Sequence, residues 1–472
     1  METLSGWVWG PYMLVLIVGT GIFLTFRLLF WQFRMLPLAF KQVFGKHPDH
    51  SGDISQFASL MTALSATIGT GNIAGVATAC VLGGPGAVFW MWMTALIGMA
   101  TSFAECSLAQ LYKEADKQGQ FRGGPAWYMA RGLGMRWMGV LFSLFLLVAY
   151  GLIFNTVQAH SVSHALRFAF DCPEIVTGSV MALFTLGVII TGIKGVARLM
   201  QWMVPVMALL WVSASLLVCV WHADQLPAVF TLIVKSAFGW HEAAAGALGY
   251  TLSQALTAGF QRGMFSNEAG LGSTPNAAAA AASWPPHPAS QGIVQMIGVF
   301  VDTIIICTAS AMIVLLAGPV DLPANTTGVQ LMQQALVNLT GDWGADFAAF
   351  IIVLFAFSSI VVNYIYAENN LLFLHADAHK SRWLLRGGAV LMVLLGSLLS
   401  LPMVWQLADI IMALMAITNL TAILLLSPVV TLIARDYLRQ RKLGVRPVFD
   451  VARYPEIEAQ LAPGAWDDLP RQ

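Results

Sequence analysis

The chain has 472 residues, of which 58% are hydrophobic and only 10% are charged, and its mean hydropathy is +0.72. A soluble globular protein is about 25% charged, so this composition excludes a soluble protein. It predicts a polytopic membrane protein that forms a single transmembrane domain over residues 1–472. The formal net charge is zero, so no nucleic-acid partner is expected, and the partner expected along the whole chain is the lipid bilayer.

Apolar runs near 20 residues, the length that a membrane-spanning helix needs, recur along the sequence. They predict an all-α protein with a leading helix at 7–30 and two sets of five helices, at 54–221 and 243–433. The ten spans of these sets are predicted at 54–81, 87–111, 138–166, 175–191, 199–221, 243–283, 291–317, 347–374, 383–401 and 404–433. A short helix at 226–239 is expected to lie over the bundle, and 434–472 is expected to be a tail.

Lysine and arginine are distributed unevenly over the predicted loops. If the loop after the leading helix is cytoplasmic, 21 of the 24 Lys and Arg residues lie in cytoplasmic loops or in the tail. Arg167 and Lys235 lie on the other side, and Arg262 lies within a span. Because cytoplasmic loops are enriched in Lys and Arg, this bias predicts an outside N-terminus and a cytoplasmic tail. The expected location is a bacterial inner membrane.

Two predicted spans, one in each five-helix set, carry polar and glycine-rich interruptions. The first reads S-A-T-I-G-T-G-N at 65–72, and the second reads R-G-M-F-S-N-E-A-G-L-G-S at 262–273. One interpretation is close helix packing through small residues, with Asn72 bonding a neighbouring helix. The other is an unwound segment in each half of an inverted repeat, where freed backbone N–H groups bind a carboxylate and freed carbonyls bind Na⁺. A matching break in both halves favours the second interpretation.

Three polar side chains in the predicted spans each have two possible roles, and a fourth lies on the same helix face as one of them. Gln158 can bond a neighbouring helix or bind the amine or carboxylate of a small substrate. The hydroxyls of Ser358 and Ser359 can bond their own helix or bind Na⁺. Asn363 follows Ser359 by four residues, so both lie on one helix face.

Charged residues inside apolar segments are expensive and usually mark a functional or paired group. Asp302 lies among the apolar residues Val299, Phe300, Val301 and Ile304, so a functional or paired role is expected for it. Arg262 and Glu268 can form a structural ion pair or contact the ligand directly. Glu105 and Asp409 lie near predicted span ends, where pairing at the interface or between helices is expected.

These motifs resemble the alanine or glycine:cation symporter family, which contains the sodium:alanine symporters. The stretches that carry the resemblance are 69–79, 83–92, 123–128, 262–273, 298–303 and 355–359. They are spread over most of the chain, from the span at 54–81 to the span at 347–374, and the resemblance as a whole extends to the last span. The resemblance implies a leucine-transporter-like 5+5 inverted repeat with broken helices 1 and 6 and one extra N-terminal helix, eleven spans in all. It also implies Na⁺-coupled, less usually H⁺-coupled, uptake of alanine or glycine.

The resemblance also implies the site residues. The implied substrate contacts are Thr70, Gly71, Asn72, Gln158, Phe265, Ser266 and Asn363. The implied Na⁺ site joins backbone carbonyls near Ser65 and Ile68 to the hydroxyls of Ser358 and Ser359. The implied partner is a small neutral amino acid, with Na⁺ as the coupling ion, and neither an organic cofactor nor an obligatory protein partner is implied.

Asn363 departs from the family pattern. Many relatives have a tryptophan at this position, so a pocket wall that is bulky and apolar in them is smaller and polar here. Serine or another small polar amino acid therefore becomes a candidate substrate. The sequence leaves open the preferred amino acid and its enantiomer, the choice of Na⁺ or H⁺, the stoichiometry and the oligomeric state.

Two other classes of function compete with symport. A membrane-embedded enzyme would use Glu268 or Asp302 as a base, but no nucleophile–base pair and no metal-ligand spacing is evident in the sequence. A passive channel for small zwitterions would let the substrate equilibrate without concentrating it.

Overall fold

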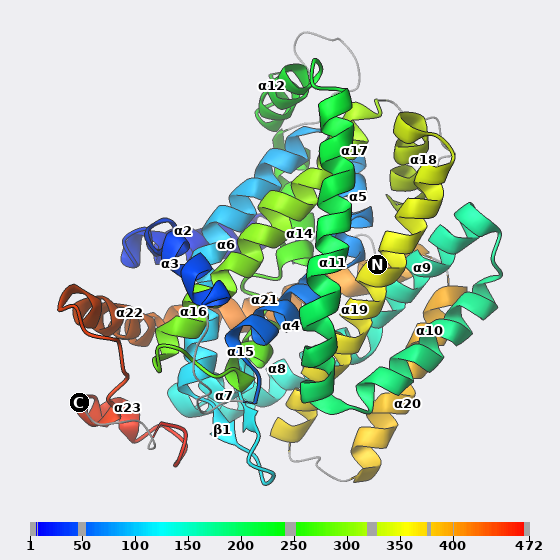
Figure 1. Ribbon diagram of the computed structural model, residues 1–472. Coiled ribbons are helices and arrows are strands. Elements are labelled where there is room, and N and C mark those ends of the chain that lie inside the picture. Colours follow the sequence, from blue (N-terminus) through cyan, green and yellow to red (C-terminus); the bar gives the residue numbers. More distant parts are fainter. Residues whose placement is uncertain are drawn as a thin grey trace.

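The computed structural model describes residues 6, 8–45, 53–240, 252–318, 328–374, 379–399 and 401–466. These residues form a helical bundle with one antiparallel two-stranded ribbon (Figure 1). The ribbon pairs β1 (Glu114–Ala115) with β2 (Phe121–Arg122). The helices are α2 (Pro11–Arg27), α3 (Trp31–Phe44), α4 (Gln56–Thr67), η1 (Thr70–Asn72), α5 (Ala74–Gly83), α6 (Gly86–Leu111), α7 (Pro125–Trp127), η2 (Tyr128–Gly132), α8 (Arg136–Val148), η3 (Ala149–Ile153), α9 (Phe154–Phe170), α10 (Glu174–Ile189), α11 (Gly192–Trp221), α12 (Leu226–Ala237), α14 (Leu252–Asn267), α15 (Pro275–Ala280), α16 (Pro288–Val299), η4 (Phe300–Cys307), α17 (Thr308–Leu316), α18 (Gly328–Thr340), α19 (Trp343–Phe373), α20 (His379–Leu398), α21 (Leu401–Leu425), α22 (Ser427–Lys442), η5 (Val451–Arg453) and α23 (Pro455–Glu458).

Seven helices in the described part of the chain are long and apolar enough to cross a membrane, or eight if the bent pair α2–α3 is one span. Seven of the ten predicted spans after the leading helix fall on these long helices. The other three fall on shorter helices: 54–81 on α4 and α5, 175–191 on α10, and 243–283 on α14 and α15. The stretch 243–251 lies outside the described residues, and the total of eleven spans stays a prediction.

The leading segment differs from the single helix predicted at 7–30. It contains α2, and α3 follows directly at an angle of 77° to it. Leu29 and Phe30 take left-handed backbone conformations, with φ of 54° and 56°, and these end the first helix. α3 buries one face through residues such as Trp31, whose ring lies 4.8 Å from that of Phe103. A search for apolar runs misses such an amphipathic helix, so the predicted loop was wrong.

The last predicted span, 404–433, is also wrong at its end. α21 ends at Leu425, and α22 begins at Ser427 and continues to Lys442, inside the predicted tail. Pro428 lies in the first turn of α22. A proline has no backbone N–H to donate and disfavours helical backbone in the residue before it, so a new helix begins there.

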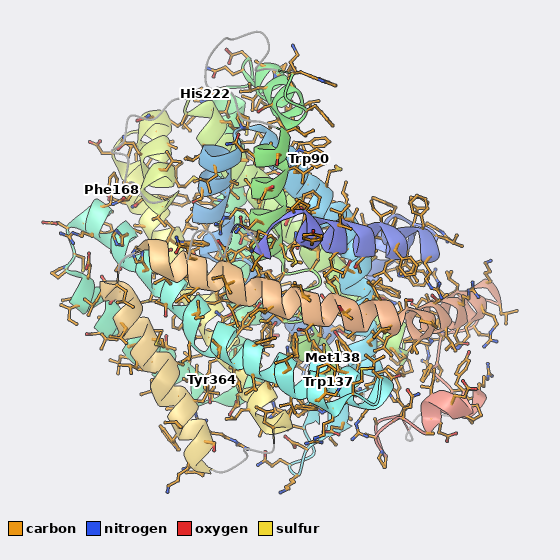
Figure 2. The ribbon with its side chains drawn as sticks, turned by 180° about the vertical axis from the view of Figure 1, so that it is seen from behind. Trp90, Trp137, Met138, Phe168, His222 and Tyr364 are labelled. Carbon is orange, nitrogen blue, oxygen red and sulfur yellow. The ribbon has the colours of Figure 1, made fainter. Side chains whose placement is uncertain are left out.

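Two groups of helices surround the two interrupted spans. α6 packs against α14, α15 and α16, whereas α19 packs against α4, α9 and α11. From behind, α21 lies across α8 and α9, and α20 covers α9 on the outside (Figure 2). α11 and α20 expose many large apolar side chains, which is the surface expected against lipid hydrocarbon.

Asp53, shortly before α4, connects several segments of the chain at one end of the bundle. Its carboxylate accepts the Phe121 N–H at 2.6 Å and pairs with Lys194 at 3.2 Å. Its backbone N–H donates to the Ala280 carbonyl at 2.9 Å, at the end of α15. The start of the first interrupted span and the end of the second are therefore joined.

Lys113 lies near Asp53, shortly after the end of α6. It is a buried basic residue, with only 2% of its surface exposed. Its ammonium lies 4.3 Å from the Phe121 ring centre and 5.0 Å from that of Trp466, in the C-terminal segment. The Trp466 indole also donates to the Leu111 carbonyl at 3.0 Å. Burial lowers the pKa of Lys113 from 10.5 to about 7, against the opposing effect of Asp53.

This pKa predicts how stability depends on pH. Between pH 7 and pH 10.5 the unfolded chain keeps the Lys113 proton and the folded chain loses it, so stability rises with pH through this window. From pH 7 to pH 9 the gain is on the order of 1–2 kcal/mol. Thermal unfolding of the purified chain should therefore show a rise in apparent melting temperature that the neutral variant Lys113→Met lacks. Parallel pH profiles for the two proteins would contradict the assignment.

Candidate functional site

The first interruption lies between α4 and α5. α4 ends at Thr67, and the chain passes through extended backbone at Gly69 into the single turn η1 before α5 begins at Ala74. Gly69 has no room for a side chain, because a Cβ there would lie 2.6 Å from the Ser359 Oγ and 2.9 Å from the Gln158 Nε2. The glycine therefore lets α9 and α19 approach the backbone of this segment.

Backbone N–H groups freed by this interruption find partners on a neighbouring helix and within the interruption itself. The Thr70 N–H donates to the Gln158 Oε1 at 3.0 Å, and the Gly69 N–H donates to the Asn72 side-chain oxygen at 3.1 Å. Such partners are required because an unpaired backbone group in hydrocarbon costs several kcal/mol.

The second interruption follows α14, which ends at Asn267. Glu268, Gly270 and Gly272 have φ of 55°, 86° and 89°, and these left-handed conformations turn the chain before α15 begins at Pro275. Glycine adopts them without strain, whereas Glu268 is a non-glycine exception. The predicted motif at 262–273 therefore spans the end of α14 and the whole turn.

Polar side chains from α6 and α21 hold the second interruption. The Glu105 carboxylate accepts the Gly270 N–H at 3.2 Å, and the Asn419 amide donates both to Glu105 at 2.9 Å and to the Gly270 carbonyl at 2.9 Å. Tyr128 donates its hydroxyl to the Asn419 side-chain oxygen. Glu105 was expected to pair at an interface or between helices, and it is fully buried between helices.

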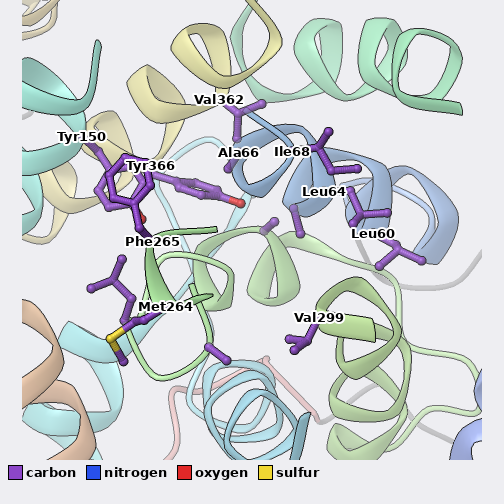
Figure 3. Packing of buried hydrophobic residues seen from close by; sticks show 14 of the residues in the cluster. Leu60, Leu64, Ala66, Ile68, Tyr150, Met264, Phe265, Val299, Val362 and Tyr366 are labelled. Atoms are coloured by element: carbon purple, nitrogen blue, oxygen red, sulfur yellow. The ribbon is translucent and has the colours of Figure 1, made fainter. Parts of the chain in front are cut away.

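The two interruptions meet at a small cavity. A Cβ on Gly71 would lie 2.8 Å from the Phe265 ring, so the segments are in contact. Ala66, Ile68 and Phe265 also belong to one buried apolar cluster (Figure 3). The cavity has a volume of about 10 Å³, near the room that one water molecule needs, and it is lined by Ala66, Thr67, Gly69, Gly71, Phe154, Gln158, Phe265, Glu268 and Asn363.

The predicted substrate residues divide into two groups in space. Four of them line the cavity: Gly71, Gln158, Phe265 and Asn363. The other three, Thr70, Asn72 and Ser266, are buried beside it, and Asn72 and Ser266 bond the Asp302 carboxylate at 2.7 and 2.6 Å.

Sequence reasoning missed several lining residues, among them Phe154. It precedes Gln158 by four residues on α9 and so lies on the same helix face. This spacing could have identified Phe154 as a neighbour of Gln158 from the sequence. The Phe154 and Phe265 rings lie 5.6 Å apart in an edge-to-face arrangement, so both rings limit the size of the cavity.

The predicted cation residues come together between α4 and α19. The Ser359 hydroxyl donates to the Ser65 carbonyl at 2.9 Å and lies 3.5 Å from the Ile68 carbonyl. The Ser358 hydroxyl lies 3.5 Å from the Ser65 carbonyl and donates to the Phe355 carbonyl at 2.9 Å. Two hydroxyl and two carbonyl oxygens therefore gather in one buried place, the kind of donor set that a hard cation prefers.

Arg262 pairs with Asp409 instead of Glu268. The guanidinium makes two bonds to the Asp409 carboxylate, at 3.1 and 3.2 Å, and lies 4.8 Å from the Trp405 ring centre. Glu268 accepts the Ser273 hydroxyl. The alternative of an Arg262–Glu268 ion pair is therefore not the one found. Glu268 lies in the turn after α14, whereas Asp409 of α21 lies beside Arg262.

Comparison with known proteins decides the class of this chain. Residues 1–451 match the model of a family described as the sodium:alanine symporter family. The chain belongs to the sodium:alanine symporter family. Its relatives are transporters and it contains several helices long enough to cross a membrane. This member of the family is therefore a multi-pass membrane transporter and not an enzyme.

Two relatives and one solved structure show how far the similarity extends. YaaJ of Escherichia coli (strain K12), an uncharacterised transporter, is 63% identical over 98% of this chain and 98% of its own length. GlnT of Bacillus subtilis (strain 168), a probable sodium/glutamine symporter, is 43% identical over 94% of this chain and 91% of its own length. The crystal structure of MhsT in complex with L-phenylalanine has a TM-score of 0.53 at 14% identity, covering 89% of this chain and 95% of that chain. That likeness shows a shared fold.

The close approach at Gly69 yields a prediction for this symporter-family chain. Gly69→Ala places a Cβ against Ser359 and Gln158, and such overpacking typically costs about 1–3 kcal/mol. The apparent melting temperature of the purified protein should fall. Gly75→Ala is the matched control, because a Cβ there meets nothing within 4 Å and alanine favours helix. Equal melting temperatures for the two variants would show that Gly69 is not sterically constrained.

Proposed function

We propose that this chain is a secondary active symporter that couples Na⁺ influx to the uptake of a small neutral amino acid such as alanine or glycine. The observation that carries the proposal is the cavity where the two interrupted helices meet, which is lined by polar side chains and by two phenyl rings. We place it in the bacterial inner membrane, with eleven spans in two inverted five-helix repeats, an outside N-terminus and a cytoplasmic tail.

The substrate carboxylate would bind the backbone N–H groups of the first interruption. The Thr70 N–H already donates a hydrogen bond to the Gln158 side-chain oxygen. A substrate carboxylate would replace Gln158 as the acceptor of this bond. The Gln158 amide would then turn to the substrate, together with Asn72 or carbonyls at the end of α14 near Ser266. Phe265, which touches Gly71, would cover the small side chain.

Asn363 is the residue that we expect to set the side-chain preference. Its amide nitrogen donates to the Asn155 side chain at 3.0 Å, and its oxygen is buried without a hydrogen-bond partner at the cavity wall. A buried acceptor gains from a donor, so a substrate hydroxyl, as in serine, would fit it. The family name points to alanine, whereas GlnT is named for glutamine, and both preferences are compatible with a small polar wall.

Sodium would bind the oxygens at Ser65, Ile68, Ser358 and Ser359. These oxygens come from α4 and α19, so an ion among them would hold the first interruption against α19. Transport is coupled only if ion and substrate together favour one conformation over another. An ion that fixes the interruption in its substrate-binding shape meets this requirement.

The direct test is accumulation in proteoliposomes that contain the full chain. An inward Na⁺ gradient should raise internal alanine above the external concentration, whereas a passive channel would only equilibrate it. The double variant Ser358→Ala and Ser359→Ala should raise the Na⁺ concentration for half-maximal uptake about 10-fold or more, which is 1.4 kcal/mol.

Ser161→Ala is the matched control for that double variant. Ser161 is buried, and its hydroxyl bonds a carbonyl of its own helix, that of Val157, at 3.0 Å. Its removal should leave the Na⁺ dependence unchanged. If the double variant behaves like Ser161→Ala, the sodium assignment is wrong, and if no gradient drives accumulation, symport itself is wrong.

The proposed role of Asn363 predicts a change in selectivity. Asn363→Ala removes the free acceptor oxygen, and one hydrogen bond contributes about 0.5–1.5 kcal/mol. The serine-to-alanine ratio of binding affinities should fall about 2- to 10-fold in competition binding. Asn369→Ala serves as control, because Asn369 bonds the Gly123 carbonyl and Asn276 away from the cavity. An unchanged ratio in Asn363→Ala would exclude the role.

A further inference from the structure

A pocket rich in arginine lies between α22, the end of α2 and the C-terminal segment, and it shares no lining residue with the proposed substrate and sodium sites. Its volume is about 620 Å³, in the range of pockets that bind small molecules. α2 and α22 lie at the left edge of the bundle in Figure 1. The polar residues that line the pocket are Arg27, Thr431, Arg435, Asp436, Arg439 and Tyr454.

The charges that line this pocket are three arginines and one carboxylate. The carboxylate, Asp436, pairs with Arg439 and lies 3.1 Å from the ring of His287, which directly precedes α16. The other two arginines, Arg27 and Arg435, pair with no carboxylate in the part of the chain that the structure describes. The pocket therefore carries an excess of positive charge, which favours an anionic ligand.

The Arg27 guanidinium is positioned at the pocket by two contacts. Its Nε donates to the Thr431 hydroxyl at 2.8 Å, and its central carbon lies 5.6 Å from the centre of the Phe23 ring. The Thr431 hydroxyl donates in turn to the Ser427 carbonyl at 2.8 Å. Among the described residues, the two Nη nitrogens of Arg27 have no hydrogen-bond acceptor. A guanidinium held in this way presents a planar set of donors that matches the oxygens of a phosphate group.

Exposed apolar side chains adjoin the pocket. On the last turns of α2, Phe23 is 40% exposed and Phe26 is 63% exposed. Leu425, at the end of α21 and three residues before the lining residue Pro428, is 52% exposed. Such side chains are expected to contact lipid hydrocarbon. A free phosphate would use only the arginines, whereas a phospholipid would use both the arginines and this apolar surface.

We propose that this pocket binds the phosphate group of an anionic phospholipid, with Arg27 and Arg435 as the phosphate contacts and the acyl chains along the end of α2. Basic pockets beside membrane helices on the cytoplasmic side bind such headgroups, and α22 lies in the region expected on that side. The lipid joins α2 to α22 and so adds to the Arg27–Thr431 hydrogen bond. This site goes beyond the proposed transport function and does not depend on it.

The test is native mass spectrometry of the purified full chain in a neutral detergent, titrated with phosphatidylglycerol. The wild type should bind one such lipid more tightly than phosphatidylcholine, whose headgroup has no net charge. An arginine near an anionic headgroup contributes about 5-fold in affinity, so the double variant Arg27→Gln and Arg435→Gln should bind phosphatidylglycerol about 10-fold or more weakly. Arg435→Glu changes one exposed side chain, and it decides the matter if the double variant does not fold.

Arg198→Gln is the matched control, because Arg198 is an exposed arginine of α11 that is expected on the same side of the membrane but lies outside the pocket. It should keep the affinity of the wild type. Unchanged affinity for phosphatidylglycerol in the pocket variants would overturn the site, and so would equal binding of the two lipids by the wild type. Inorganic phosphate that binds as tightly as phosphatidylglycerol would indicate a site for soluble phosphate and would overturn the assignment to a lipid.

Discussion

Inside a membrane every backbone N–H and C=O needs a partner, and this requirement explains the polar residues of the bundle. Where the two interrupted spans lose helical hydrogen bonds, side chains from other helices replace them. Gln158 on α9 accepts from Thr70, and Glu105 on α6 and Asn419 on α21 bond both backbone groups of Gly270. Each break is therefore attached to helices that are distant from it in sequence.

The same constraint gives the central cavity a lining of both polar and apolar groups. Glycine at 69 and 71 lets side chains of α9, α19 and α14 reach the backbone, and Phe154 and Phe265 contribute two aromatic rings that lie edge to face. Connections on both sides of the second interruption hold the arrangement. The Arg262–Asp409 pair joins α14 to α21, and breaking a buried pair of this kind typically costs about 3–5 kcal/mol. Asp53 joins the end of α15 to the start of α4.

Apolar runs predicted the long helices closely, because hydrocarbon thickness fixes the length of a span. The run at 87–111 became α6, and 347–374 became α19, which begins four residues earlier and ends one residue earlier. The method failed at α3 and α22. α3 is amphipathic, so its mean hydropathy is low although one face is buried, and Pro428 divides the last predicted span into two helices. Hydropathy measures composition, not the direction of side chains.

The sequence by itself determined the membrane class, the family motifs and the residue types at the interruptions, since all three depend on neighbours along the chain. The tertiary structure decided which side chains meet. Arg262 pairs with Asp409, 147 positions away, and Asn72 reaches Asp302, 230 positions away. Such contacts depend on how helices pack and on the turn at 268–274, and no local spacing encodes them. For that reason the bonds of Asn72 and Ser266 to the Asp302 carboxylate could not be predicted from the sequence.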